Sequence, residues 1–141
     1  MAADIGTTRS VRRRRELAQA GRALGWLILA QLALRVWSYI AIRRALVRLP
    51  HRSTASPMTA VECEQAVHRA GRIVRGASCL ACAIAAACLL RREGHDSTLT
   101  LGVRFGPGHR LLAHAWLESG GRRITGGPET SEHRVLLRDL I

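Results

Sequence analysis

The sequence contains no lysine and few aromatic residues. All 22 basic residues are arginine, and 10 acidic residues leave a formal net charge of +12. Such a charge favours an anionic partner: nucleic acid, an anionic membrane face, or an acidic protein or peptide. The 3 tryptophans, 1 tyrosine and 1 phenylalanine are not interleaved with the arginines, as they are in surfaces that stack nucleic-acid bases. We therefore expect no nucleic-acid partner.

Cysteine is also scarce, with 4 residues in 141. They are too few and too clustered for a secreted disulfide scaffold. Cys79 and Cys82 form a lone CxxC, without a second CxxC, an HxxxH or the preceding strand of a redox motif, so we expect neither a metal nor an organic cofactor. Cys63, Cys82 and Cys88 are assigned to packing. The polar first ten residues do not resemble a signal peptide, and the cytoplasm is the expected compartment.

The N-terminal part combines arginine with a long apolar stretch. We expect a disordered start of ten residues and then a basic apolar helix that opens at Arg12 and stops before Pro50. Between Ala23 and Ile42 the only charged residue is Arg35, and this length is sufficient to span a bilayer. An arginine at mid-span costs roughly 2.5 to 3.5 kcal/mol on insertion scales. The pattern favours a helix packed into protein, and leaves open a helix lying in a membrane interface or spanning the membrane.

Two further helices follow a linker at residues 51–57. Thr59 and Glu62 have the spacing of a capping box, which predicts a helix through about Ile73. Ser78 is the expected N-cap of the next helix, which begins at Cys79 and ends near Arg92 before a glycine. This second helix is apolar on nearly every face, so we expect it to be buried at the centre of the domain.

After Gly94 the apolar residues change from a helical period to alternation, which marks strands. The predicted strands cover residues 98–105, 111–118, 122–125 and 134–140. Helices followed by an antiparallel meander predict an α+β domain in which the buried helix packs on the sheet. We expect this domain at residues 58–141, after an N-terminal part at residues 1–57.

Cys79 and His114 are the candidate catalytic residues. Cys79 lies in the first turn of the buried helix, where unpaired N–H groups and the helix dipole stabilise a thiolate. His114 lies in the middle of a predicted strand beside Trp116, where alternation predicts a half-buried imidazole within reach of a helix N-terminus. A nucleophilic thiol needs such a base. A packed thiol and a core histidine are the plain alternatives. The other five histidines lie in polar stretches and are expected to be solvated.

The stretch from about Thr59 to Leu140 resembles the lasso-peptide biosynthesis B2 proteins, which are transglutaminase-like (papain-like) cysteine proteases. The resemblance rests on four segments and on the arginine-rich apolar helix that precedes them. The segments are Ser78-Cys79-Leu80 with its alanine-rich helix, Leu101-Gly102-Val103-Arg104, Ala113-His114-Ala115-Trp116-Leu117-Glu118, and Gly121 with its short strand. The resemblance implies a cysteine protease core and assigns Cys79 and His114 as nucleophile and base.

The third member of the family's triad does not carry over. An acidic residue is expected about a dozen residues beyond the histidine, and Gly126 occupies that place. Glu129 is the nearest acidic residue and is our candidate. Glu118 shares a strand face with His114 but lies two pleats away, roughly 13 Å at strand rise. A ring oriented by a backbone carbonyl is the remaining option.

The resemblance implies a leader peptidase that acts on a ribosomally made lasso-peptide precursor before macrolactam cyclisation. Its implied partners are the precursor leader peptide, a small leader-recognition protein of the B1 type, and an asparagine-synthetase-like cyclase. The N-terminal helix is expected to dock on one of these proteins or on a membrane surface. Two alternatives are an acyl transferase that uses the same site, and a non-catalytic interaction or membrane-surface protein with a decayed site.

Overall fold

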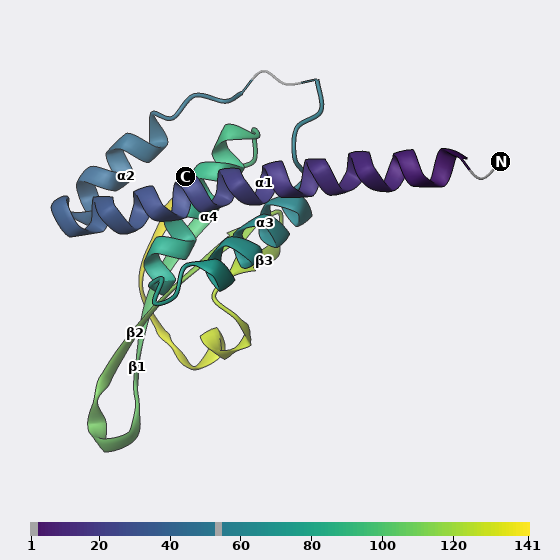
Figure 1. The fold of residues 1–141 in the computed structure, drawn as a ribbon. Coiled ribbons are helices and arrows are strands. Elements are labelled where there is room, and N and C mark those ends of the chain that lie inside the picture. Colours follow the sequence, from purple (N-terminus) through teal and green to yellow (C-terminus); the bar gives the residue numbers. More distant parts are fainter. Residues whose placement is uncertain (1–2, 53–54) are drawn as a thin grey trace.

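The computed structural model describes residues 3–52 and 55–141, with the backbone alone for residues 3–7, 129 and 130. Helices come first within these residues: α1 (Ala3–Val36), α2 (Tyr39–Val47), α3 (Ala60–Ile73) and α4 (Cys79–Arg92). Strands follow: β1 (Thr98–Phe105), β2 (Leu111–Ser119), β3 (Arg122–Thr125) and β4 (Arg134–Leu140). Two short 3-10 helices, η1 (Pro107–His109) and η2 (Pro128–Glu132), lie in the loops. The predicted α+β architecture is confirmed (Figure 1).

The N-terminal helix differs from the prediction at both ends. A disordered start was expected for the first ten residues, but residues 3–10 are helical, because no proline or turn motif separates them from the apolar stretch; residues 1 and 2 lie outside the described residues. A single helix up to Pro50 was also wrong. Ser38 starts a second helix, since its side chain accepts a hydrogen bond from the N–H of Ala41 at 3.4 Å.

The two N-terminal helices share one core with the rest of the chain. Ala23 and Leu27 of α1 and Leu46 of α2 are buried in the same cluster as the side chains of α4. Gln19 Nε2 donates to Glu62 Oε1 at 3.2 Å, which fixes α1 to the start of α3. On its buried side, α1 is therefore packed into protein. The hydrophobic core includes residues on both sides of residue 57, where the sequence analysis placed the domain boundary.

Glu93 is the most deeply buried acid that ties α1 to the domain. Its side chain is 1% exposed, and it pairs with the guanidinium of Arg22. Its second oxygen accepts a hydrogen bond from the N–H of Met58 at 2.8 Å. Burial alone raises the pKa of Glu93, but the hydrogen bonds from Arg22 and Met58 outweigh it and lower the pKa below its ordinary value. The acid is therefore charged in the core and joins α1 to the segments around α3 and α4.

Helix α4 is the central element, as its composition predicted. It lies between α1 and α3 on one side and the sheet on the other (Figure 1). The run from Ala83 to Leu90 is buried throughout, because alanine side chains let the neighbouring helices approach closely. The capping box of Thr59 with Glu62 and the N-cap at Ser78 are both confirmed. The caps fix where α3 and α4 begin, and hence where Cys79 stands.

The sheet is antiparallel with strand order β3-β2-β1-β4. One face carries Leu99, Ala115, Leu117 and Ile124, which belong to the core cluster around α4. Because successive residues of a strand alternate between faces, His114 and Trp116 point to the other face. The β1–β2 hairpin extends beyond the helices (Figure 1).

Candidate active site

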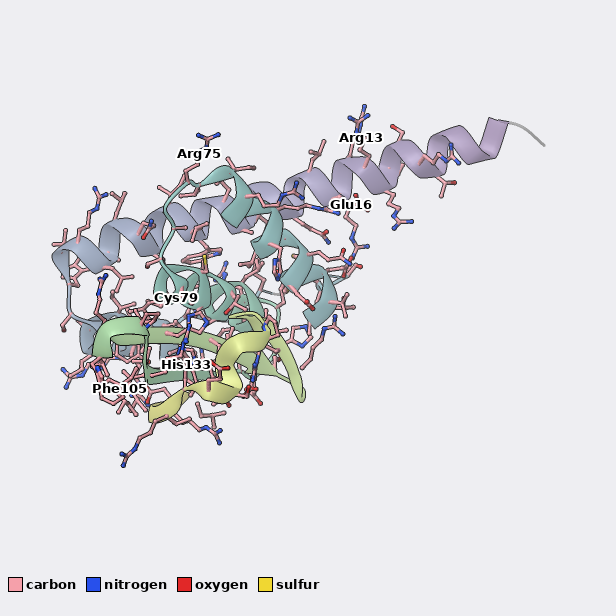
Figure 2. The ribbon with its side chains drawn as sticks, turned by 90° about the horizontal axis from the view of Figure 1, so that it is seen from below. Arg13, Glu16, Arg75, Cys79, Phe105 and His133 are labelled. Atoms are coloured by element: carbon pink, nitrogen blue, oxygen red, sulfur yellow. The ribbon has the colours of Figure 1, made fainter. Side chains whose placement is uncertain are left out.

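Cys79 is the first residue of α4, and its side chain is half-buried against the core (Figure 2). Ser78 Oγ accepts the N–H of Ala81 at 3.1 Å, and the helical hydrogen bonds begin at the N–H of Cys82. The N–H groups of Cys79 and Leu80 therefore have no helical partner, as at any helix N-terminus. These two groups and the helix dipole favour a negative charge at this place, either a thiolate or the oxyanion of an attacked carbonyl.

The other three cysteines are packing residues, as predicted. All four thiols are free, so the CxxC does not form a disulfide. Burial raises the pKa of Cys63 and of Cys88 to about 12. Burial, with a smaller effect from Cys79, also raises the pKa of Cys82. These thiols stay protonated and unreactive near neutral pH.

The side chains of the metal-binding types are dispersed over the fold. Among the described residues, no group of three or more histidine, cysteine, aspartate or glutamate side chains is placed to hold a metal ion.

The imidazole of His114 is held by a backbone carbonyl. In the β1–β2 ladder His114 lies opposite Gly102, and its Nε2 is 2.8 Å from the carbonyl oxygen of Gly126. A carbonyl can only accept, so Nε2 carries the proton in this hydrogen bond. In the neutral ring Nδ1 is then unprotonated and free to act as an acceptor. The ring is thereby oriented as a base.

Gly126 lies where the resemblance places the third catalytic residue, and its backbone carbonyl makes the contact with His114 that an acidic side chain would make. Its φ of +107° is unfavourable for any residue with a side chain. A Cβ at this position would lie 2.3 Å from Trp116 Cβ and 3.1 Å from Trp116 Cα. An acid cannot occupy this position without displacing Trp116, and the structure supports the carbonyl option that the sequence left open.

The acidic candidates do not contact the ring in the described residues. The backbone of Glu129 lies in η2, but its side chain is outside the described residues. Glu118 Oε1 instead pairs with Arg123 Nη2 at 3.1 Å. The guanidinium of Arg123 also lies 5.8 Å from the centre of the Trp116 ring. Glu118 therefore holds Arg123 over Trp116 rather than orienting His114.

His133 is a site residue that the sequence analysis missed. It was expected to be solvated, but its ring centre is 5.3 Å from that of His114 and 6.2 Å from that of Trp116. Trp116 itself is stacked on His114 at 25° with ring centres 6.2 Å apart. The position of His133 depends on the path of residues 126–133 across the sheet, for which no local motif exists.

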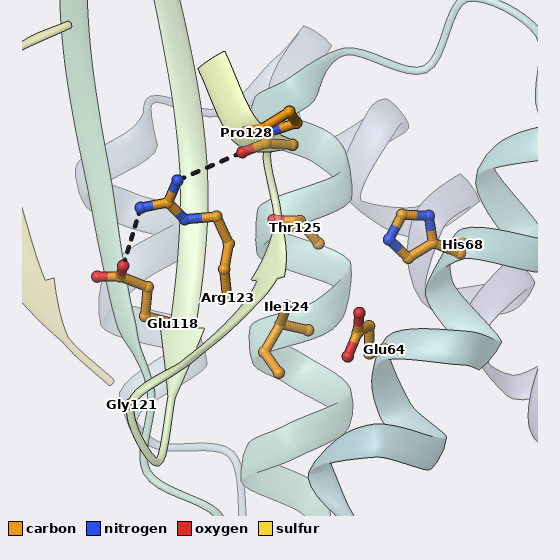
Figure 3. Close-up of a pocket in the computed structure, with 9 residues that line it drawn as sticks. Glu64, His68, Glu118, Gly121, Arg123, Ile124, Thr125 and Pro128 are labelled. Atoms are coloured by element: carbon orange, nitrogen blue, oxygen red, sulfur yellow. Dashed lines mark hydrogen bonds and ion pairs between the residues drawn. The ribbon is translucent and has the colours of Figure 1, made fainter. Parts of the chain in front are cut away.

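A cavity of about 360 Å³ opens beside the His114 ring. A neighbouring hollow of about 480 Å³ shares Gly127 and Pro128 with it (Figure 3). Arg123 lies in this second hollow and donates to the carbonyl of Gly127 at 3.3 Å. The two hollows adjoin each other at Gly127 and Pro128. The first is lined by Arg104, Leu112, Ala113, His114, Gly126, Gly127, Pro128 and His133.

The thiol of Cys79 and the imidazole of His114 each have a defined position, but no hydrogen bond connects them. Among the described residues, no hydrogen bond connects Cys79 Sγ with the His114 ring, whose only such contact is with Gly126. Catalytic hydrogen bonds are often long or unmade in ligand-free enzymes and tighten when substrate binds. His114 points to the sheet face opposite the one on which α4 packs. A thiol-to-imidazole transfer at this site therefore requires the ring to move toward Sγ when a peptide binds.

The sequence profile of the transglutaminase-like superfamily matches residues 24–138. The chain belongs to the transglutaminase-like superfamily. No curated protein and no solved structure matches it. The match begins inside α1, so it includes the N-terminal helices as well as α4 and the sheet. Superfamily membership is consistent with cysteine peptidase or acyl transferase chemistry in general.

Proposed function

We propose that the chain is a cysteine peptidase that removes the leader from a ribosomally made lasso-peptide precursor. The observation that carries the proposal is the orientation of His114 by the Gly126 carbonyl at the position of the third triad member. This contact fixes the tautomer that a base requires. The start of α4 supplies the complementary part, a thiol beside unpaired N–H groups.

In the proposed reaction His114 Nδ1 accepts the proton of Cys79, and the sulfur attacks the scissile carbonyl carbon. The N–H groups of Cys79 and Leu80 donate to the developing oxyanion. His114 then returns the proton to the leaving amine, which is the N-terminus of the core peptide. Water attacks the thioester, gives its proton to Nδ1, and releases the leader as a carboxylic acid with the thiol restored.

The arginine content supports an acidic leader as the substrate class. Arg104 lines the cavity at His114, and Arg123 lines the neighbouring hollow. The net charge of +12 attracts an acidic peptide over a range set by the ionic strength. We further propose that a small leader-recognition protein presents the leader and that an asparagine-synthetase-like cyclase consumes the freed amine. The cytoplasm is the proposed site of this reaction.

The proposal is tested with the precursor-like peptide encoded beside the gene for this chain, incubated with the chain and any small leader-recognition protein encoded there. We expect two fragments in the mass spectrum whose summed mass equals the precursor plus one water. The same incubation with a primary amine in excess should still give mainly the free leader acid. A leader–amine conjugate as the main product would contradict hydrolysis and favour acyl transfer. An intact precursor in every incubation would favour the alternative of a non-catalytic chain. The observation behind this alternative is that position 126 is a glycine and not an acidic residue.

A further inference from the structure

The second half of α1 is apolar on the side that faces away from the protein. Ala23, Leu27 and Ala30 are buried against the other helices. On the opposite side Leu32 is 52% exposed and Val36 is 76% exposed. A helix that covers a soluble core normally carries polar residues on this side. We call the exposed set the apolar face of α1: Ile28, Leu29, Leu32 and Val36, with Trp37 and Ile40 at the turn into α2.

The apolar face continues into a groove between α1 and α2. The groove has a volume of about 310 Å³ and a floor formed by Ile84 and Cys88 of α4. Trp37 and Leu29 belong both to the groove and to the apolar face. Trp37 is 60% exposed at this edge, and tryptophan is the residue type most typical of the boundary between lipid and water. The exposed apolar surface is therefore one continuous patch.

Arginine is the prevailing charged residue type of α1 and α2, although Asp139 pairs with Arg43 of α2 and Glu16 and Glu62 pair with Arg12 and Arg15. The sequence has no acidic residue between Glu16 and Glu62, although arginines recur throughout this interval. Along the chain, Arg12 to Arg15 precede the apolar face, Arg35 lies in the last turn of α1, and Arg44 and Arg48 lie in the last turn and at the C-cap of α2. Figure 2 shows the first half of α1, with Arg13, projecting beyond the rest of the fold. An apolar strip between clusters of arginine complements the surface of a bilayer with anionic headgroups.

A membrane-spanning arrangement does not fit the packing. The segment Thr8–Val36 is long and apolar enough to cross a membrane, and 28% of its most apolar window is buried inside the protein. Spanning would remove Leu27 from the core and break the contacts of Gln19 with Glu62 and of Arg22 with Glu93. A helix that keeps these contacts can enter only the headgroup region, with its axis along the surface.

We propose that this protein binds the surface of membranes that contain anionic phospholipids, through the apolar face of α1 and its flanking arginines. In this orientation α1 lies parallel to the bilayer, and α4 separates it from the sheet. The β1–β2 hairpin projects away from α1 (Figure 1). The His114 cavity is consequently on the aqueous side, accessible to a soluble peptide. The proposal concerns a different surface and does not depend on the peptidase function.

The proposal is tested by sedimentation of the full chain with vesicles. We expect binding to vesicles of equal parts phosphatidylglycerol and phosphatidylcholine, weaker binding as salt increases, and little binding to phosphatidylcholine alone. Binding should also shift the tryptophan emission to shorter wavelength, because Trp37 leaves water. The double variant Leu32→Glu/Val36→Glu should bind at least about tenfold more weakly, since both side chains contribute to the buried apolar area.

The matched control is Phe105→Glu/Leu111→Glu on the hairpin, where the two side chains are 73% and 60% exposed. It should bind anionic vesicles as the wild type does, and circular dichroism should show that both double variants are folded. The proposal is overturned if the wild type stays in the supernatant, or if Leu32→Glu/Val36→Glu still sediments like the control. It is equally overturned if the wild type is a dimer in solution that Leu32→Glu/Val36→Glu dissociates, because the face then binds a second copy.

Discussion

A Cys79→Ala variant is expected to release no core peptide, with the cleavage rate lower by about 10⁴-fold or more. The expectation follows from covalent catalysis, because alanine supplies no atom that can form the thioester. The buried α4 tolerates this change, since Cys79 is only half-buried and Ser78 continues to cap the helix. Loss of activity without loss of the folded state therefore separates a chemical role from a structural one. The measurement is the rate of precursor cleavage by mass spectrometry, together with the melting temperature.

Cys82→Ala is the matched control for this variant. Cys82 lies one turn along the same helix, also half-buried, but burial raises its pKa and keeps its thiol protonated. We expect its cleavage rate to stay within about threefold of the wild type, as for a packing residue outside the reaction. Cleavage by Cys79→Ala at a rate close to that of Cys82→Ala would show that the thiol of Cys79 is not the nucleophile.

The second large effect is expected for Gly126→Asp, which puts a carboxylate where the resemblance places the missing acid. We expect lower activity and lower stability rather than a repaired triad. The left-handed backbone at Gly126 costs a residue with a side chain roughly 1–3 kcal/mol. The new Cβ would also overlap Trp116 Cβ, and Trp116 is stacked on His114. The substitution therefore displaces both the ring and the carbonyl that orients it.

The melting temperature of Gly126→Asp should fall by at least about 2–4 °C, the shift that corresponds to 1 kcal/mol in a domain near this size. Gly127→Ala separates strain from overlap, because Gly127 has a φ of +64° but a Cβ added there would have nothing within 4 Å. It should lose stability through backbone strain alone and keep most of its activity. A Gly126→Asp enzyme that is as stable as the wild type and more active would refute the role given to the Gly126 carbonyl.

The elements that the sequence predicted correctly are those with local causes. The capping box at Thr59 and the N-cap at Ser78 depend on neighbours three residues away, so the starts of α3 and α4 were readable. Alternation from Leu99 to Phe105 likewise marked β1. The break of the N-terminal helix at Ser38 was missed because the apolar pattern continues across it. The exposure of Leu32 and Val36 was also not predictable, since composition does not show which side of α1 meets α4.

In the candidate site, too, the features with local causes were predicted from the sequence and the others were not. The first-turn position of Cys79 and the half-buried state of His114 follow from a cap and from strand alternation. The contact of His114 with Gly126 depends on how the chain turns after β3, and the approach of His133 depends on the loop that follows. The first contact has no signal in residue type, because one partner is a main-chain carbonyl. The second has none because it depends on the path of the loop. The assignment of Glu129 stays a prediction, since its side chain lies outside the described residues.

Site-resolved alkylation measures whether His114 activates the thiol of Cys79. The chain is treated with a chloroacetamide reagent at neutral pH, and the modified cysteines are quantified in peptides by mass spectrometry. We expect Cys79 to react first and Cys63 and Cys88 to remain unmodified, because their pKa values are about 12. In His114→Ala the reaction at Cys79 should be slower by about tenfold or more. Equal modification of all four cysteines, or an unchanged rate at Cys79 in His114→Ala, would contradict activation of Cys79 by His114.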